Sequence, residues 1–593
     1  MQPASPVVQL QADPVLRSAG CLVLAALPAL SVASTPADSD PAADRPAIHL
    51  NQLGFLPGAD KLAVVEGIGS GRYAVVREDD GRVVIEGRLP AATVWPASGR
   101  AAATVDFGAL HAPGRYRLRV EGQDSDPFPV GADVYAALGD AALKGYYFAR
   151  SGTALAPEHA GPHARAAGHP DTEVEIHPSA ASPGRPAGSV VSAPGGWYDA
   201  GDYNKYVVNS GITTHTLLAA WEDFPQLFRD RDIGIPESGD AVPDLLDEAW
   251  WNLRWMLAMQ DPGDGGVYHK LTNLRFDGLV MPAQANERRY MVGKSTAAAL
   301  DFAAVMAQAA RVYAGFETQF PDLPGRMRSA AEGAWRWAQA NPDVVYRQPG
   351  DVSTGAYGDE QLDDEFAWAA AELFVLTGDG HYLQAFERHA VEAGVPNWAD
   401  VGGLAWATLA RHRERLPDDA LRARVSAALT GLAAQLAERS RNSAWRIAMQ
   451  PQDFVWGSSA QALNQGLMLV QAHRLTGDRG FLDAAQSQLD YVLGRNPLGV
   501  SFVTGHGLRT PMHIHHRPSQ ADGIDAPVPG LLSGGPNPRQ QDAVDCPVPY
   551  ASSQPALSWI DHDCSYASNE IAINWNAPLV YMAAAIQALT PAD

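Results

Sequence analysis

Cysteine, basic residues and long apolar runs are all scarce in this chain of 593 residues. Lys and Arg number 44 against 67 Asp and Glu, which leaves a net charge of −23. Nucleic acids and anionic membranes are bound by basic patches, so this balance argues against both as main partners. Only three cysteines are present, and in an exported chain Cys546 and Cys564 either form one disulfide or remain two unpaired thiols.

One apolar run, "CLVLAALPALSVAS" at 21–34, has the length of a secretory signal core, and no other run is long enough to span a membrane. Ser31 and Ala33 are the small residues that a cleavage site needs at its −3 and −1 positions. We therefore expect residues 1–33 to be a signal peptide and the mature protein to be secreted or periplasmic.

Two regions with different periodicities follow a polar linker at 34–46. Between 47 and 131 the sequence alternates short strand-like runs such as "YAVVRED", "RVVIEGRL" and "RYRLRVEG" with Gly, Asp and Pro turns. This pattern predicts a small antiparallel sandwich. No catalytic cluster lies in it, so we interpret it as a packing module that braces the rest of the chain.

Helical periodicity dominates from 135 to 593. The segment 242–260, "VPDLLDEAWWNLRWMLAMQ", places a proline at a helix start and repeats large apolar residues on one face. Gly378 and Gly477 suit left-handed helix ends, and the Asp after each suits the cap of the next helix. Repeated hairpins of about a dozen helices predict a helical toroid or solenoid. Further helices are predicted at 295–314, 325–340, 364–377, 402–414, 420–439, 460–475, 481–493 and 570–589.

Asp199 and Asp202 stand three residues apart in the glycine- and aromatic-rich stretch "GGWYDAGDYNKYV". Taken alone, the two carboxylates could cap a helix, bind calcium or carry out chemistry. A second feature is the stretch 496–562, which shows no convincing helix or strand. A structureless stretch of that length inside a compact domain usually has a function.

Two further clusters carry ionisable side chains. The segment 501–519 could form a zinc site, although its crowded spacing favours a platform that hydrogen-bonds a polar ligand; its residues of interest are His513, His515, His516 and Arg517. The segment 559–578 holds Asp561 and Glu570, and Glu570 could simply favour a helix N-terminus. Together the clusters supply what glycoside hydrolysis needs, namely a protonated carboxyl group and an ionised one.

These motifs resemble glycoside hydrolase family 9, which includes many cellulases. "GGWYDAGDYNKYV" resembles the family's DAGD segment, and "SFVTGHGLRTPMHIHHR" resembles its histidine signature. "WIDHDCSYASNEIAINWNA" resembles its acidic signature, with Asp561 and Glu570 nine residues apart. "IHLNQLGFLPGADKLAVV" at 48–65 resembles an immunoglobulin-like module that precedes some catalytic domains of the family. The implied architecture is an immunoglobulin-like sandwich over 47–131, followed by an (α/α)6 barrel over 135–593.

The resemblance also implies roles for individual residues. Asp202 corresponds to the general base that activates water, Asp199 to a residue that orients that water, and Glu570 to the general acid. The family inverts the anomeric configuration, and Glu570 then needs a raised pKa to stay protonated. Asp561 corresponds to a carboxylate that supports the site. By the same resemblance, His515 belongs to the catalytic centre. The residues implied in substrate binding are Arg517, His516, Tyr566 and Trp197.

The sequence gives different indications for a zinc site and for a calcium site. Some relatives carry a zinc site of Cys and His ahead of the DAGD segment, but Ser151 and Pro162 stand where the thiols would be, so we expect no zinc. "GDEQLDDEFAWAA" resembles a calcium-binding turn, for which the candidate ligands are Asp364, Glu365 and Asp400. Helix capping by a surface acidic cluster is an equal alternative. No organic cofactor is expected.

The sequence thus predicts an inverting endo-β-1,4-glucanase that acts on a β-1,4-linked polysaccharide or oligosaccharide. An exo-acting β-glucosidase, cellodextrinase or exo-β-D-glucosaminidase of the same family is the first alternative. The segment 157–194, directly before the Asp pair, could fold over one end of a cleft and favour the exo mode. A carbohydrate-binding protein without activity is the alternative of another class, and it predicts missing catalytic carboxylates.

Overall fold

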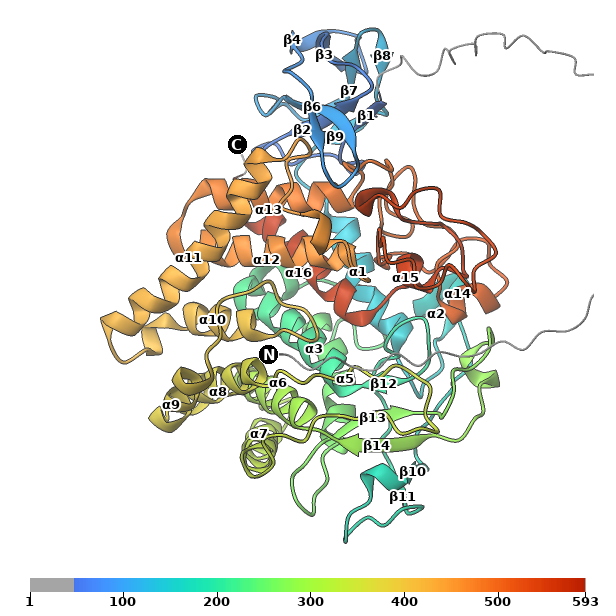
Figure 1. Cartoon of the computed structure of the whole chain (residues 1–593), viewed down its shortest axis with the longest axis vertical. Coiled ribbons are helices and arrows are strands. Elements are labelled where there is room, and N and C mark those ends of the chain that lie inside the picture. The colour runs from blue at the N-terminus through green and yellow to red at the C-terminus, as the bar shows by residue number, and fades with distance from the viewer. Residues whose placement is uncertain (1–46, 592–593) are drawn as a thin grey trace, which may run out of the picture. The chain divides into compact units, whose positions relative to one another are not determined.

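The computed structural model describes residues 47–591, so the expected signal peptide and linker lie outside the described residues. Its first part is a sandwich of two sheets, β1-β2-β6-β5 and β4-β3-β7-β8 with β9 paired to β7 (Figure 1). The strands are β1 Ala47–His49, β2 Leu62–Glu66, β3 Arg72–Arg77, β4 Val83–Arg88, β5 Thr93–Trp95, β6 Arg100–Asp106, β7 Gly114–Val120, β8 Gln123–Asp124 and β9 Phe128–Val130. The predicted immunoglobulin-like sandwich is therefore confirmed.

The alternation of side chains along β2 shows how the sandwich is joined to the helical domain. Ala63 and Val65 pack into the core between the two sheets. Val64, between them, points to the opposite face and belongs to the core of the helical domain. Because successive residues of a strand face opposite sides, one short strand serves two cores.

Polar contacts reinforce this junction. The side-chain amide of Asn51, fully buried, donates to Asp490 Oδ1 at 2.8 Å and to the Tyr135 hydroxyl at 2.9 Å. The side-chain oxygen of Gln52 accepts hydrogen bonds from the backbone N–H groups of Leu508 and Arg509 at 2.7 and 3.0 Å. The side-chain amide of Asn51 and the side-chain oxygen of Gln52 thus have their partners in the helical domain, which makes these residues of the "IHLNQLG" segment a fixed attachment.

Within residues 47–591, twelve helices of ten or more residues form two rings. Contacts run from α3 to α6, α8, α10, α12 and α16 and back to α3, which closes an inner ring, and each inner helix has an outer partner. The helices, inner before outer, are α3 Val207–Asp223 with α5 Asp244–Ala258, α6 Thr296–Tyr313 with α7 Leu323–Ala340, α8 Asp363–Thr377 with α9 Gly380–His389, α10 Gly402–Arg411 with α11 Asp419–Asn442, α12 Ser458–Thr476 with α13 Arg479–Val492, and α16 Ile573–Leu589 with α1 Ala136–Ala149. This is an (α/α)6 barrel.

The predicted helix signals are confirmed where they were specific. Gly378 and Gly477 adopt left-handed φ values of 73° and 75°, and the side chains of Asp379 and Asp478 cap α9 and α13. Three helices lie outside the predicted ranges, and α3 is the most instructive of them: it is buried almost all round and contains several Val and Thr residues. A helix without an exposed face shows no amphipathic period, and its composition has low helix propensity.

The remaining elements are a five-stranded sheet and irregular loops at the site. The sheet order is β11-β10-β14-β13-β12, formed by β10 Val174–Ile176, β11 Val190–Val191, β12 Lys205–Tyr206, β13 Tyr268–Thr272 and β14 Tyr290–Lys294. Short helices are α2 Pro157–Ala160, α4 Pro225–Phe228, α14 Arg517–Ala521 and α15 Tyr566–Asn569. The segment 157–194 thus contributes β10 and β11 to this sheet. The strand at the opposite edge, β12, follows the loop that carries Asp199 and Asp202. The role of the segment 157–194 over a cleft remains a prediction.

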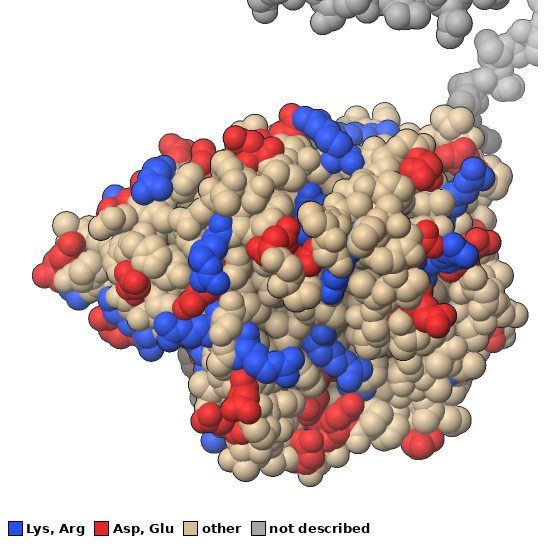
Figure 2. Space-filling model, turned by 90° about the horizontal axis from the view of Figure 1, so that it is seen from below, with Lys and Arg blue, Asp and Glu red and all other residues tan. Residues whose placement is uncertain are grey.

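The surface carries charges of both signs. On the face shown in Figure 2, acidic and basic side chains are interspersed. No helix among residues 47–591 is long and apolar enough to cross a bilayer.

The interdomain contact of Asn51 yields a stability prediction. Replacing Asn51 with Ala removes two buried hydrogen bonds and leaves a carboxylate oxygen of Asp490 with fewer donors. We expect a loss of about 1–3 kcal/mol of stability, measured by thermal unfolding. Arg82→Ala, on the exposed part of the sandwich, is the control and should stay within about 0.5 kcal/mol. An unchanged unfolding midpoint in Asn51→Ala would refute the bracing role of the sandwich.

Candidate active site

The loops that enter the inner helices bring the predicted catalytic residues together. Asp199 and Asp202 precede α3, and Glu570 lies between α15 and α16. Backbone hydrogen bonds join these segments, because the N–H of Ile573 donates to the carbonyl of Asp199 at 2.8 Å. The backbone N–H of Gly201 in turn donates to Glu570 Oε1 at 3.4 Å. Residues separated by more than 360 positions thereby meet in one site.

Asp199 and Asp202 are buried, with exposures of 1% and 5%, and their hydrogen bonds differ. Both oxygens of Asp199 accept a bond, Oδ1 from Asn209 and Oδ2 from the Tyr357 hydroxyl, each at 2.7 Å. In Asp202, Oδ2 accepts from Asn204 at 2.6 Å and from the Tyr206 hydroxyl at 3.1 Å. No donor among the described residues reaches Asp202 Oδ1, which leaves that oxygen available for a water molecule.

Electrostatics separate the two aspartates. Burial, and then the negative charge of Asp202, raise the pKa of Asp199 to about 8. Burial also raises the pKa of Asp202, but the positive charges of Arg517 and Arg289 and two hydrogen bonds oppose that rise. The carboxylate form is therefore favoured at Asp202 over Asp199.

The pKa of Glu570 is raised more strongly than that of Asp202. Burial and then the charges of Asp202 and Asp199 raise its pKa well above the usual value, and Arg517 opposes this only in part. The Glu570 carboxyl group therefore keeps its proton at pH values where an exposed glutamate has lost it. Both pKa values are raised, that of Glu570 more strongly, and two carboxyl groups whose pKa values are held apart are the arrangement that acid–base chemistry requires.

Gly201 allows this close arrangement. A Cβ atom at that position would lie 2.4 Å from the carbonyl oxygen of His515 and 3.2 Å from Glu570 Oε1. Any side chain would push the histidine segment away from the aspartates. The glycine of the DAGD motif is thus needed for space.

The histidine segment is fixed by the acidic segment. His515 Nδ1 lies 2.6 Å from the carbonyl oxygen of Asp563, which can only accept, so Nδ1 carries the proton and Nε2 remains free for a ligand. Asp561 accepts the backbone N–H groups of Met512 and His513, both at 2.9 Å. Asp561 therefore acts as a support for this loop.

Arg517 is buried and its guanidinium group links two loops. Nη1 donates to the carbonyl of Gly201 at 2.7 Å, and Nε donates to the carbonyl of Asp277 at 3.0 Å. Its charge faces both Asp202 and Glu570. The structure thus places Arg517 in the centre of the site, where it holds backbone and tunes carboxyl groups.

One predicted substrate contact is wrong and another is shielded. Trp197 is 0% exposed, packs on Tyr146 and donates its indole N–H to Glu248, so no sugar can stack on it. The aromatic pattern of the motif does not distinguish a core ring from a sugar platform. His516 is also buried, and its Nδ1 pairs with Ser519 at 2.8 Å.

Aromatic residues that sequence analysis missed lie beside the catalytic groups. Tyr566 does lie near His515, with ring centroids 6.1 Å apart, and its ring also contacts Trp456, which is 41% exposed. On the Asp199 side, Tyr357 contacts the ring of Trp398 edge-on at 5.1 Å. Trp456, Tyr357 and Trp398 all precede inner helices, but no local motif marks them.

A cluster of carboxylates lies near Tyr357. Asp364 and Glu365 begin α8, Asp400 precedes α10, and two residues not predicted from sequence, Asp301 and Asp359, face them. Burial and mutual repulsion raise the pKa values of Asp301 and Glu365 well above their usual range. Oxygen atoms of Asp301, Asp359 and Glu365 are buried without a hydrogen-bond partner among the described residues. Carboxylate oxygens of this kind are the hard donors that Ca²⁺ prefers in proteins.

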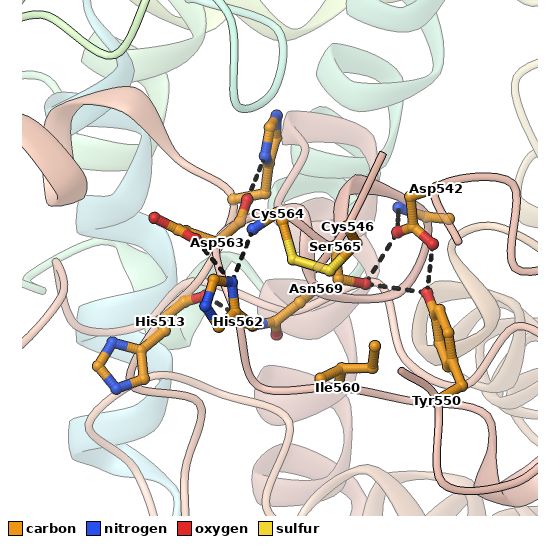
Figure 3. Close-up of a disulfide and its surroundings, with 12 residues drawn as sticks. His513, Asp542, Cys546, Tyr550, Ile560, His562, Asp563, Cys564, Ser565 and Asn569 are labelled. Atoms are coloured by element: carbon orange, nitrogen blue, oxygen red, sulfur yellow. Dashed lines mark hydrogen bonds and ion pairs between the residues drawn. A yellow bond between two sulfur atoms is a disulfide. The ribbon is translucent and has the colours of Figure 1, made fainter. Parts of the chain in front are cut away.

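The cysteine pair is a disulfide, which decides between the two alternatives that the sequence left open (Figure 3). His562 lies beside Cys546 and Cys564, and the three could hold a metal ion only with the thiols reduced. At the position of the zinc site of some relatives, His163 instead pairs with Asp522 at 3.0 Å and His169 with the Tyr198 hydroxyl at 2.9 Å.

A closed double ring of helices with two aspartates and a glutamate at the entrances of its inner helices is the architecture of a glycoside hydrolase. Residues 135–583 match glycosyl hydrolase family 9, and residues 43–125 match the cellulase N-terminal immunoglobulin-like domain. The chain belongs to glycosyl hydrolase family 9.

Two bacterial proteins and a ligand complex show how far the similarity extends. The chain is 42% identical to the xyloglucan-specific endo-beta-1,4-glucanase of Bacteroides ovatus, over 95% of this chain and 97% of that one. It is also similar to the solved structure of a Bacteroides ovatus family 9 protein, with a TM-score of 0.86, 41% identity and coverage of 92% and 99%. The structure of AaCel9A in complex with cellobiose-like isofagomine gives a TM-score of 0.84 at 32% identity, over 91% of this chain and all of that one.

Proposed function

We propose that this protein is an inverting endo-β-1,4-glucanase with Asp202 as general base and Glu570 as general acid. The observation that carries the proposal is the different electrostatic setting of these two buried carboxyl groups. Two arginines oppose the rise in the pKa of Asp202 and one of its oxygens is free, while burial and two negative charges keep the proton on Glu570 against the positive charge of Arg517 alone. An inactive carbohydrate-binding protein would not need this difference.

The geometry supports a single-displacement mechanism. Glu570 donates its proton to the leaving glycosidic oxygen as the bond to the anomeric carbon breaks. Asp202 Oδ1 accepts a proton from a water molecule, whose oxygen attacks the anomeric carbon from the opposite face and inverts its configuration. Asp199 orients that water through the lone pairs left after its bonds to Asn209 and Tyr357. His515 Nε2 and the exposed rings beside it contact the sugar.

The substrate is proposed from similarity. The Bacteroides ovatus relative is named as specific for xyloglucan, a branched β-1,4-glucan, so a soluble glucan with side chains is the first substrate to test. Exo-acting cleavage and glucosamine oligomers remain the alternatives. Export of the enzyme is a further proposal, supported by the disulfide between Cys546 and Cys564.

The first experiment compares product time courses on xyloglucan, on an unbranched soluble β-1,4-glucan and on chitosan oligomers. Viscosity and reducing ends are followed together. We expect viscosity to fall rapidly while few new ends appear, because internal cleavage shortens long chains at once. Release of monomer or dimer from one end, or activity confined to chitosan oligomers, would contradict the endoglucanase proposal.

The acid role of Glu570 predicts a leaving-group effect. Glu570→Gln should lower kcat/KM on natural glucan by about 10²–10⁴-fold, because the leaving oxygen then departs without a proton. On aryl glycosides with good leaving groups, the same variant should lose much less of its kcat/KM. Equal losses on both substrate types would show that Glu570 is not the acid.

We also propose that the carboxylate cluster holds Ca²⁺ as a structural ion through Asp364, Glu365 and Asp400, with Asp301 and Asp359 beside them. Removing the ion would leave the negative charges of these carboxylates to repel one another. Chelation should lower the unfolding midpoint by at least about 3 °C, and added Ca²⁺ should restore it. Glu365→Gln should weaken this calcium dependence. Asp363→Asn, which changes an exposed residue next to the cluster, is the control. A wild-type unfolding midpoint that does not change with calcium would refute the site.

A further inference from the structure

Lys270 is a buried charge that the reaction described above does not use. It lies on β13 opposite Tyr206 of β12 and is 0% exposed. Its Nζ donates three hydrogen bonds, to Gln348 Oε1 and Thr354 Oγ1 at 3.0 Å and to the carbonyl of Gly355 at 2.7 Å. No carboxylate of residues 47–591 lies within ion-pair distance of it. Burying an ammonium group without a carboxylate partner is costly, so its position calls for an explanation.

All three acceptors of Lys270 lie in one short segment, 348–355, and this segment leads to both aspartates. The backbone N–H of Gly355 donates to the Tyr206 hydroxyl at 3.1 Å, and that hydroxyl donates to Asp202 Oδ2. Two residues further along the chain, the Tyr357 hydroxyl donates to Asp199 Oδ2. The ammonium group therefore fixes the segment through which each aspartate is held by a tyrosine.

The charge of Lys270 also reaches the site. Burial lowers the pKa of Lys270 to about 7, and the group that opposes this fall is Asp202. The interaction is mutual, so protonated Lys270 favours the carboxylate form of Asp202. The aromatic rings of Tyr206 and Tyr346 lie 5.6 and 5.7 Å from Nζ and further stabilise the cation.

We propose that Lys270 is a positioning residue for the aspartate pair, which aligns Tyr206 and Tyr357 on the two carboxyl groups and supports the ionised state of Asp202. This inference rests on the proposed role of Asp202 as base. It adds a long-range requirement to the site, because the base is set by a lysine that hydrogen-bonds to none of the three carboxyl groups.

The direction of the pH effect follows from the charges around Asp202. Arg517 and Arg289 favour its ionised form, whereas Asp199 and Glu570 oppose it. Removing the charge of Lys270 takes away one favourable contribution and raises the pKa of Asp202. Since the base must be ionised, the acid side of the profile of kcat/KM against pH then moves to higher pH.

The test measures this profile on a soluble β-1,4-glucan for wild type and Lys270→Met, together with unfolding midpoints. We expect Lys270→Met to lower kcat/KM at least about tenfold at pH 6 and to move the acid limb upward by about 0.5 unit or more. Lys270→Arg, which keeps the charge, should leave the limb near its wild-type position.

The matched control is Lys294→Met in the neighbouring strand β14. Lys294 is also largely buried and lies over a tyrosine ring, but it pairs with Asp261 and Asp264, away from the aspartate pair. This variant should lower the unfolding midpoint and leave the acid limb unmoved. A profile of Lys270→Met that superimposes on the wild type would overturn the proposal.

A second variant keeps the proposal testable if Lys270→Met does not fold. Tyr206→Phe removes the phenol that links the lysine-bound segment to Asp202 and should move the acid limb in the same direction. An unmoved limb in Tyr206→Phe would also overturn the inference. The proposed function is tested separately by Asp202→Asn, since hydrolysis retained in that variant would refute the base itself whatever the Lys270 variants show.

Discussion

Repulsion among buried carboxyl groups is the constraint on which this structure depends. Asp199, Asp202 and Glu570 are buried together in one site, where burial and mutual repulsion disfavour three negative charges at once. The surrounding residues determine which groups keep their protons. Arg517 and Arg289 both place positive charge near Asp202, whereas Glu570 is compensated by Arg517 alone and repelled by both aspartates, so the resulting asymmetry supports a base and an acid from chemically similar side chains.

The barrel supplies the rigidity that such an arrangement requires. Its inner helices, rich in alanine and buried on nearly every side, pack closely, and the loops that enter them carry the functional groups. Carboxyl groups are also crowded in the cluster before α8 and α10, where Asp301, Asp359 and Glu365 keep buried oxygen atoms without a hydrogen-bond partner among the described residues. Tyr357 lies two residues from Asp359 of that cluster and bonds to Asp199, so the two acidic sites share a segment.

Local signals predicted much of this architecture. Glycine and aspartate at the helix junctions located the ends of α8 and α12, and alternation identified the sandwich. The three carboxyl groups proposed for catalysis lie within recognisable motifs, as do Asn204 and Tyr206, although the bonds of these two to Asp202 could not be predicted from sequence. Contacts between loops that are far apart in the sequence are not marked by any local sequence pattern. Tyr357, Lys270 and Asp301 lie outside the motifs, and their roles depend on which segments fold side by side. Trp197 shows the reverse error, because an aromatic residue in a catalytic motif can belong entirely to the core.

The attachment of the sandwich has an evolutionary consequence. Gln52 binds the backbone at Leu508 and Arg509, in the same segment that continues to His515. Asn51 meanwhile depends on Asp490 and Tyr135 of the barrel. In this chain the two domains are therefore not interchangeable modules. A recombination that replaces one of them keeps these hydrogen bonds only if it also brings matching partners on the other.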